Sequence, residues 1–293
     1  MKIKALLLAC VLLGNPIAAS GSSDEEAVVE AAPLKKRKAL VSNDTSRNSH
    51  IDTLDFSHAS SLKNIEFVVY FLNVMYLNLE GCYNLKDSYH SVSVLINLRE
   101  LNLRNVKLSA TAPLKFLTNL TSLNLGANPD ISTVKDIITL TRLIRLDLEG
   151  NWYITDLERI SSLTFLEDLS LKGVFNDDKA SYPTLDFVAF LTNLRRLNLG
   201  FNDYIFYIKP IAMLPFLTHL DLSNAKEIRD LDTLSSLTTL KKLDLQYLSP
   251  NEYVMSNKQK FLKKLTNLKT LRIDPELRIP RLSSRIKIKI RKA

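Results

Sequence analysis

Side chains that could carry out catalysis are few in this chain and lie far apart in the sequence. The histidines are His50, His58, His90 and His219, and the sequence contains neither an HExxH zinc motif nor a nucleophile elbow. Once a leader containing Cys10 is removed, Cys82 is the only cysteine, and a small buried residue explains it better than a reactive thiol. We therefore expect that the protein is not an enzyme.

Metal and nucleotide binding are disfavoured as well. The segment Asn176-Asp177-Asp178 carries oxygen ligands, but it lacks the alternation and the closing Glu of a calcium loop. A phosphate-binding loop needs clustered glycines, whereas five of the seven glycines recur singly at matching turns, which turn geometry would explain: Gly81, Gly126, Gly150, Gly173 and Gly200. We expect no metal and no cofactor, so binding to another molecule is the function for which residues must be found.

The segments that must position any binding residues form a tandem repeat. Ten times between Ile51 and Ile273 the chain shows an apolar residue at every third position, followed by Leu-x-Leu. The first leucines of the Leu-x-Leu steps are Leu54, Leu77, Leu101, Leu123, Leu146, Leu169, Leu197, Leu220, Leu243 and Leu271. Seven of the nine spacings are 22 to 24 residues, and the two others are 28. Units this short cannot bury an apolar face alone, so they must stack on one another.

The phrase LxxLxxLxLxxN, seen in LTNLTSLNLGAN from Leu117 to Asn128, resembles the leucine-rich repeat family over residues 51–276. Repeat length makes it somewhat internalin-like, although the next apolar residue, such as Ile131, comes one position later than in internalin-like repeats. The closing Asn is present only at Asn128, Asn151 and Asn202, so we expect an incomplete ladder of side-chain bonds between turns. The resemblance implies a secreted, non-enzymatic scaffold that recognises a protein.

Periodicity within each repeat predicts its geometry. Spacing by three suits 3₁₀-like turns, and spacing by two suits a short strand, so each repeat contributes one strand and one returning segment. We predict an α/β leucine-rich repeat solenoid, a horseshoe or arc of about ten repeats. Its concave side is a parallel β-sheet, and its convex side consists of 3₁₀ or short helices.

Residues that flank the buried leucines form columns across the concave face. The residue between the two leucines is short and polar in nine of ten repeats, from Asp55 to Asp244, which favours a scaffold role with lateral bonds between strands. The flanking columns vary and mix both signs, which disfavours a polyanion such as nucleic acid. Solvated ion pairs and a charged partner footprint both explain these columns.

Aromatic side chains gather just beyond the strands, at one rim of the predicted sheet. They are Tyr83, Trp152, Tyr153, Phe175, Phe201, Tyr204 and Tyr247. Each alone could be turn packing, but together they are the best candidate anchors for a protein partner. The predicted partner-binding residues are Tyr76, Glu100, Arg104, Arg145, Glu149, Trp152, Tyr153, Asp168, Lys172, Arg196, Phe201, Tyr204, His219 and Tyr247.

Both ends of the chain differ from the repeats. Residues 1–20 have the cations, the short apolar run and the small residues of a secretory signal peptide, and residues 21–50 read as a flexible linker. Residues 277–293 form a basic C-terminal cap or tail, and residues 251–293 as a whole hold 13 Lys and Arg against 3 Asp and Glu. The segment RIKIKIRK, Arg285 to Lys292, has the period of a strand with one apolar face.

These observations predict a secreted, periplasmic or cell-envelope protein. We expect a monomer without a transmembrane segment that binds a protein through its concave face and aromatic rim. A host protein becomes a natural partner if the source is an intracellular bacterium. The alternatives are that the basic tail attaches the protein to an anionic membrane surface or nucleic acid, or that the protein is a structural envelope component.

Overall fold

The structure is a computed structural model that describes residues 51–175, 184–248, 260–274 and 286–290, together with the backbone of four residues nearer the N-terminus. Those four residues, Val28–Val29 (β1) and Ala39–Leu40 (β2), form an antiparallel pair that the sequence did not predict. The predicted signal peptide and the acidic segment Asn176-Asp177-Asp178 lie outside the described residues.

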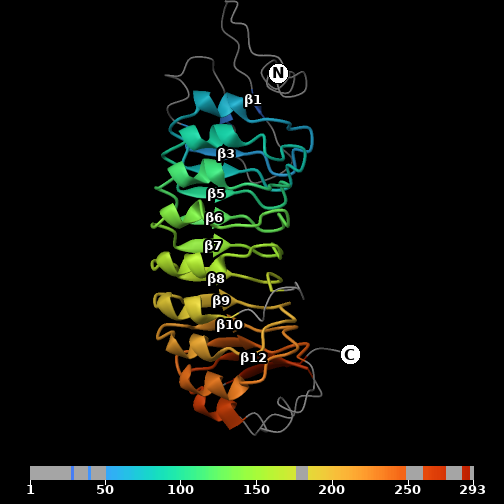
Figure 1. Ribbon diagram of the computed structural model, residues 1–293, viewed down its shortest axis with the longest axis vertical. Helices are drawn as coiled ribbons and strands as arrows, with labels where there is room; N and C mark the ends of the chain where they lie inside the picture. The colour runs from blue at the N-terminus through green and yellow to red at the C-terminus, as the bar shows by residue number, and fades with distance from the viewer. Residues whose placement is uncertain are drawn as a thin grey trace, which may run out of the picture.

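Eleven short strands form one parallel sheet in chain order, which gives the elongated stack of Figure 1. The first ten are the strands predicted from the Leu-x-Leu steps. They are β3 (Thr53–Asp55), β4 (Tyr76–Asn78), β5 (Glu100–Asn102), β6 (Ser122–Asn124), β7 (Arg145–Asp147), β8 (Asp168–Ser170), β9 (Arg196–Asn198), β10 (His219–Asp221), β11 (Lys242–Asp244) and β12 (Thr270–Ile273). The eleventh, β13 (Lys287–Ile290), comes from the basic tail and pairs in parallel with β12.

A 3₁₀ helix forms in each returning segment, as the spacing by three predicts. In η2, for example, the Val68 amide donates to the Ile65 carbonyl at 3.0 Å. The helices are η2 (Glu66–Tyr70), η3 (His90–Val94), η4 (Ala112–Phe116), η5 (Ile137–Thr139), η6 (Leu157–Ser162), η7 (Asp186–Phe190), η8 (Lys209–Met213), η9 (Leu231–Ser236) and η10 (Lys260–Lys264). All helices in the described residues are of this type, so the helical layer consists of 3₁₀ turns rather than α-helices.

The core is a continuous apolar column between the sheet and the 3₁₀ layer. In register, Leu101 of β5 lies beside Leu123 of β6, and Leu123 lies beside Leu146 of β7. The exposed fraction of each of these leucines is 2% or less. Each repeat therefore buries its leucines against those of its neighbours, as a solenoid requires.

The C-terminal strand extends the sheet but not the buried core. Ile288 and Ile290 continue the columns of Leu271 and Ile273 in register, yet they are 38% and 57% exposed. No described segment covers them, because β13 is the last strand of the stack. The expected strand is present, and its apolar side is open among the residues that the structure describes.

Buried asparagines join the turns that follow the strands. The Asn128 amide Nδ2 donates to the carbonyls of Leu125 and Leu103, both at 2.8 Å, while its Oδ1 accepts from the Val106 and Leu108 amides of the preceding repeat. Asn151 Oδ1 accepts from the Asn128 amide at 2.8 Å. The ladder therefore links one repeat to the previous one wherever the closing Asn is present.

One residue in each turn has a left-handed backbone. Glycine occupies this position at Gly81, Gly150 and Gly173, while Ala127 and several larger residues occupy it elsewhere. Gly126 and Gly200, which we had also assigned to turn geometry, do not have positive φ. Both lie in the turn, but a left-handed backbone is not the reason for glycine there; a Cβ on Gly126 would lie 2.4 Å from Nη1 of Arg104, the movable end of that side chain.

Candidate functional site

The short polar residue between the two leucines of a repeat ends the strand. In eight repeats the side-chain Oδ1 accepts a hydrogen bond from the backbone amide two residues later, for example Gly126 to Asn124 at 2.9 Å and Ser223 to Asp221 at 2.9 Å. This is the Asx turn, in which a short polar side chain ends a strand. The column is scaffold as predicted, but its bonds lie mainly within each turn instead of between strands.

Two arginines cross the small residues of β6 in opposite directions. Arg104, after β5, reaches over Gly126 to Glu149, with Nη1 3.0 Å from Oε2. Arg145 of β7 reaches past Ser122 to Glu100 of β5, with Nη2 2.7 Å from Oε1. Both crossings span two strand spacings, which is possible because Ser122 of β6 and Gly126 in the turn after it are small.

Opposite charges on neighbouring strands form ion pairs at two places in these columns but not at a third. Arg145 lies beside Asp168 of the next strand in register, yet its ion pair is with Glu100 on the other side. Arg196 does pair with Asp168 at 2.7 Å, and Lys172 pairs with Glu149 at 2.9 Å. Although partial burial opposes it, the charges and hydrogen bonds of Lys172 and Arg104 lower the pKa of Glu149 below its ordinary value.

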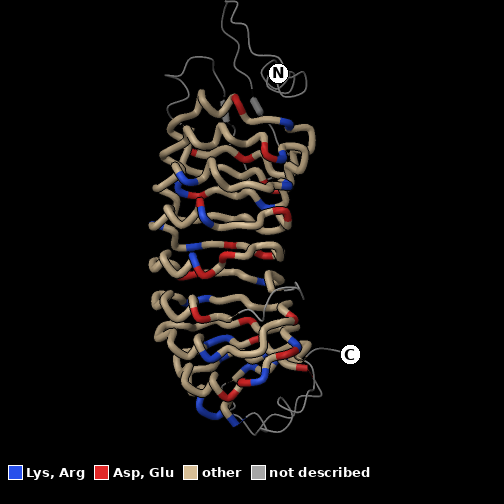
Figure 2. The backbone as a smooth tube through the Cα atoms, in the orientation of Figure 1, with Lys and Arg blue, Asp and Glu red and all other residues tan. Residues whose placement is uncertain are grey.

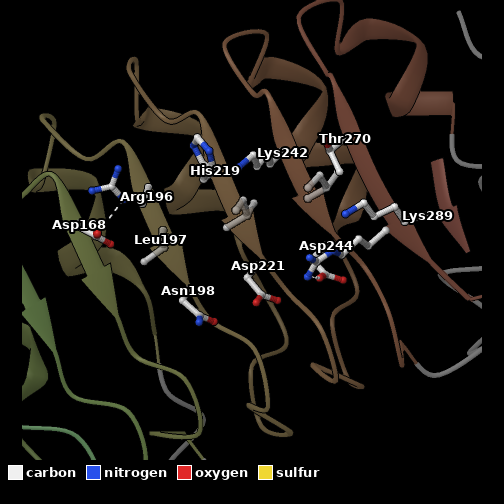
Figure 3. Close-up of a pocket in the computed structure, with 13 residues that line it drawn as sticks. Asp168, Arg196, Leu197, Asn198, His219, Asp221, Lys242, Asp244, Thr270 and Lys289 are labelled. Carbon is white, nitrogen blue, oxygen red and sulfur yellow. Dashed lines mark hydrogen bonds and ion pairs between the residues drawn. The ribbon is translucent and has the colours of Figure 1, made fainter. Parts of the chain in front are cut away.

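The concave face, meaning the sheet surface that carries these columns, holds a hollow near each end. The N-terminal hollow, of about 330 Å³, is lined by residues of β3 to β6 that include Asp55 and Glu100 and no cation. The C-terminal hollow, of about 370 Å³, extends over β8 to β13 and contains His219, Lys242 and Lys289 (Figure 3). Figure 2 shows both charge signs along the stack, with several Lys and Arg positions in the last repeats.

His219 lies between two cations in the C-terminal hollow. Its register partners are Arg196 on β9 and Lys242 on β11. Partial burial, and then the charges of Lys242, Arg196 and Lys241, lower the pKa of His219 below its ordinary value of 6.5, while Asp168 opposes them. The imidazole is therefore held in its neutral form until the pH is low or an anion approaches.

Aromatic side chains are exposed at the rim where the chain leaves the strands. Trp152 is 41% and Tyr153 is 52% exposed, and their rings meet edge-on with centroids 6.1 Å apart. Phe201 and Tyr247 are also exposed, and Tyr204 is half-buried. We define Trp152, Tyr153, Phe201, Tyr204 and Tyr247 as the aromatic rim.

Phe175 does not belong to this surface, although the sequence suggested it. Its side chain is only 8% exposed and joins the core, while its amide donates to Oδ1 of the buried Asn202 at 2.8 Å. Tyr83 is 40% exposed, with Lys107 Nζ 5.6 Å from its ring centroid. Tyr76, the first residue of β4, is also exposed, and it lies on the concave face.

Sequence reasoning missed two groups. One comprises Lys242, Lys287 and Lys289 at the C-terminal end of the sheet, because Lys287 and Lys289 come within two strands of Lys242 only once β13 joins the sheet. The other is an exposed apolar row at the opposite edge of the sheet, made by residues beside the buried leucines: Tyr70, Leu72, Val94, Ile96, Phe116, Phe165, Phe190, Met213 and Phe216. The signal for this row is an apolar residue at positions where sibling repeats carry Thr, Ser or Asn.

Cys82 is buried, as the sequence suggested. Burial raises the pKa of the Cys82 thiol to about 11, and its Sγ lies 3.1 Å from the Phe56 carbonyl oxygen. A cluster of three or more potential metal ligands does not occur within residues 51–175, 184–248, 260–274 and 286–290. Nor is any helix there long and apolar enough to cross a bilayer.

Comparison with known proteins places the fold. Neither a protein-family model nor a curated protein matches the chain. The crystal structure of an internalin, InlF, from Listeria monocytogenes strain 4b F2365 is 22% identical, with a TM-score of 0.59 over 87% of this chain and 90% of that one. Internalin C2 from the same strain is 25% identical, with a TM-score of 0.57 over 80% and 84%.

The chain folds as an internalin-like leucine-rich repeat solenoid. The functional domain of InlJ from Listeria monocytogenes, which includes a cysteine ladder, is 22% identical with a TM-score of 0.51 over 78% of this chain and 50% of that one. This solenoid instead places asparagines in its turns, and Cys82 is the one free cysteine among its described residues.

Proposed function

We propose that this solenoid is a secreted, non-enzymatic scaffold that binds a protein partner through its aromatic rim and concave face. The leucine-rich repeat resemblance and the signal-like N-terminus support export and recognition. The surface itself supplies the stronger support, because its exposed residues vary from repeat to repeat while the scaffold beneath them recurs.

Backbone strain at the rim is the observation that carries the proposal. Phe201 and Tyr247 have φ of 58° and 59°, at the turn position that glycine occupies in three sibling repeats and His, Asn or Ala occupies in four others. A bulky residue is disfavoured in this left-handed conformation, by about 1–2 kcal/mol. Folding alone favours glycine there, so an exposed aromatic ring kept at this cost is best explained by a use for the ring.

Neighbouring charges hold part of the rim in place. Lys172 pairs with Glu149, and its Nζ also lies 4.9 Å from the centroid of the Phe201 ring. Glu149 is in turn held by Arg104 from the other side. A side chain fixed before binding loses less entropy on binding, so this arrangement favours recognition.

Replacing Trp152, Tyr153 and Tyr204 with alanine tests the rim. We expect capture of the partner to fall about tenfold or more. Capture is measured by quantitative pull-down from lysates of the source organism and of any cells to which the protein is exposed. Aromatic residues in interfaces commonly contribute more than 1 kcal/mol each, which is the physical reason for this loss. The circular dichroism melt should change little, because Trp152 and Tyr153 are exposed and Tyr204 is half-buried.

A matched variant replaces Phe165, Phe190 and Phe216, at the opposite edge of the sheet, with alanine. It removes a similar area of exposed aromatic surface and should leave capture unchanged. Unaltered capture by the rim variant would contradict the proposal, as would an equal loss in both variants.

A further inference from the structure

Three cations and a histidine lie in one register row across the last five strands, and most of this row lines the C-terminal hollow. The backbone register places Arg196, His219, Lys242, Thr270 and Lys287 side by side on β9 to β13. This row, which we call the basic row, contains no carboxylate. Figure 3 shows several of its members along one side of the hollow.

A second row beside it mixes both signs: Asp244 forms an ion pair with Arg272, whereas Asp221 is bonded only to a backbone amide and keeps its charge. Asp221 Oδ1 accepts from the Ser223 amide at 2.9 Å, and Asp244 accepts from the Gln246 amide and from Arg272 at 3.1 Å. In the basic row, by contrast, Lys242 and Lys287 make no ion pair with any residue that the structure describes. Lys242 and Lys287 therefore offer positive charge that no described carboxylate pairs with, while Arg196 is already paired with Asp168.

Building on the proposed function, we propose that the basic row binds an extended, acidic segment of the protein partner, and that protonation of His219 tightens this binding.

Strand geometry fits a peptide with alternating acidic residues. Adjacent strands lie about 4.8 Å apart, so the basic row from β9 to β13 spans about 19 Å. An extended peptide places same-side residues about 6.7 Å apart, so three or four alternating carboxylates reach along the row. A segment lying across the strands would thus meet Arg196, His219, Lys242 and Lys287 in turn.

Other polyanions fit this surface less well. A flat membrane does not follow a hollow formed over six strands of a curved sheet. A nucleic-acid backbone carries closely spaced phosphates, and it would place some of them beside Asp221 and Asp244. No cation lines the N-terminal hollow, so an acidic segment finds complementary charge only at the C-terminal of the two hollows.

The pH effect follows from the groups around His219. Lys242, Arg196 and Lys241 disfavour its protonation, Asp168 favours it, and the Thr218 hydroxyl lies 2.9 Å from its Nδ1. A docked carboxylate adds negative charge and raises the pKa of His219, so binding takes up a proton. Binding must therefore be stronger at low pH, as long as the acidic peptide itself stays ionised.

The test uses synthetic probes with the full chain. A fluorescein-labelled ten-residue peptide of alternating Glu and Ser is titrated with the protein and followed by anisotropy at pH 7.5 and pH 5.5, where Glu remains mostly ionised. We expect binding that is weakened by salt and about three- to tenfold tighter at pH 5.5. Peptides with Gln or Lys in place of Glu should not bind.

Variants locate the site. Lys242→Glu should weaken binding of the Glu peptide about tenfold or more, and His219→Asn should remove the pH dependence but keep binding. The matched control is Lys115→Glu on the exposed side of η4, which changes the net charge equally and should leave binding unchanged. Circular dichroism melts verify that each variant is folded.

Several outcomes would overturn the inference. They are equal weakening by Lys115→Glu, equal binding of the Gln peptide, or a pH effect that persists in His219→Asn. Binding of duplex DNA or phosphatidylserine vesicles through Lys242, without binding of the Glu peptide, would assign the row to another polyanion. Because the rim variant is scored by partner capture, the proposed function can survive a failure of the peptide experiment, and the reverse also holds.

Discussion

Replacing Asn128 with alanine is expected to lower the free energy of unfolding by about 3–5 kcal/mol. The side chain is fully buried and bonds the carbonyls of Leu103 and Leu125 as well as the amides of Val106 and Leu108. Alanine would leave these buried backbone groups without partners, at about 1–3 kcal/mol for each group that cannot find another. Urea unfolding followed by circular dichroism measures the change.

Two further variants separate hydrogen bonding from other causes. Asn97→Ala removes an exposed asparagine whose Nδ2 donates to the Leu72 carbonyl at 3.1 Å, and it should cost less than about 1 kcal/mol. Asn128→Asp keeps the shape but points an oxygen at two carbonyls and buries a charge, so it should destabilise at least as much as alanine. A loss below about 1 kcal/mol in Asn128→Ala would show that the ladder is not what couples these turns.

Leu146→Ala should lower the free energy of unfolding by about 2–5 kcal/mol. Leu146 is 2% exposed and lies in register between Leu123 and Leu169, so truncation leaves a cavity shared by three repeats. The control is Ile144→Ala, two residues earlier, where the side chain is 37% exposed and the expected loss is below about 1 kcal/mol. Equal losses at both sites, measured by urea unfolding, would contradict the shared core.

Much of the fold could be predicted because the buried positions of each repeat keep their apolar residues and their spacing. Each Leu-x-Leu step became a strand, and each run with a spacing of three became a 3₁₀ helix. The order of the sheet then follows from stacking alone. Sequence could not predict the open face of β13, because Ile288 and Ile290 have the same pattern as buried strand residues and differ only in lying at the end of the stack.

Side-chain contacts were harder to predict because they depend on which neighbours are small. The sequence places Arg145 beside Asp168 on the adjacent strand, but the short Ser122 opens a path to Glu100 two strands away, and the ion pair forms there. The closing asparagines, in contrast, were correctly expected to bond between turns, because a buried amide must find partners. Asp55 to Asp244 were correctly assigned to the scaffold, although their own turns supply most of their bonds.

The aromatic rim could be proposed from sequence, but its strain could not. A sequence places Phe201 and Tyr247 beside the glycine positions of sibling repeats, yet only the backbone angles show that they hold the left-handed conformation. Phe175 illustrates the limit of the pattern. Like the rim residues it is aromatic and follows a strand, but its side chain is buried in the core.

Site-specific photocrosslinking is the most direct test of protein recognition at the rim. A photoreactive residue is placed at Tyr153 on the rim or at Glu158 on the exposed side of η6, in two otherwise identical proteins. We expect one discrete protein adduct from position 153, lost when Trp152 and Tyr204 are also replaced by alanine, and no such adduct from position 158. Equal adducts from both positions, or an adduct from position 158 alone, would contradict recognition through the rim.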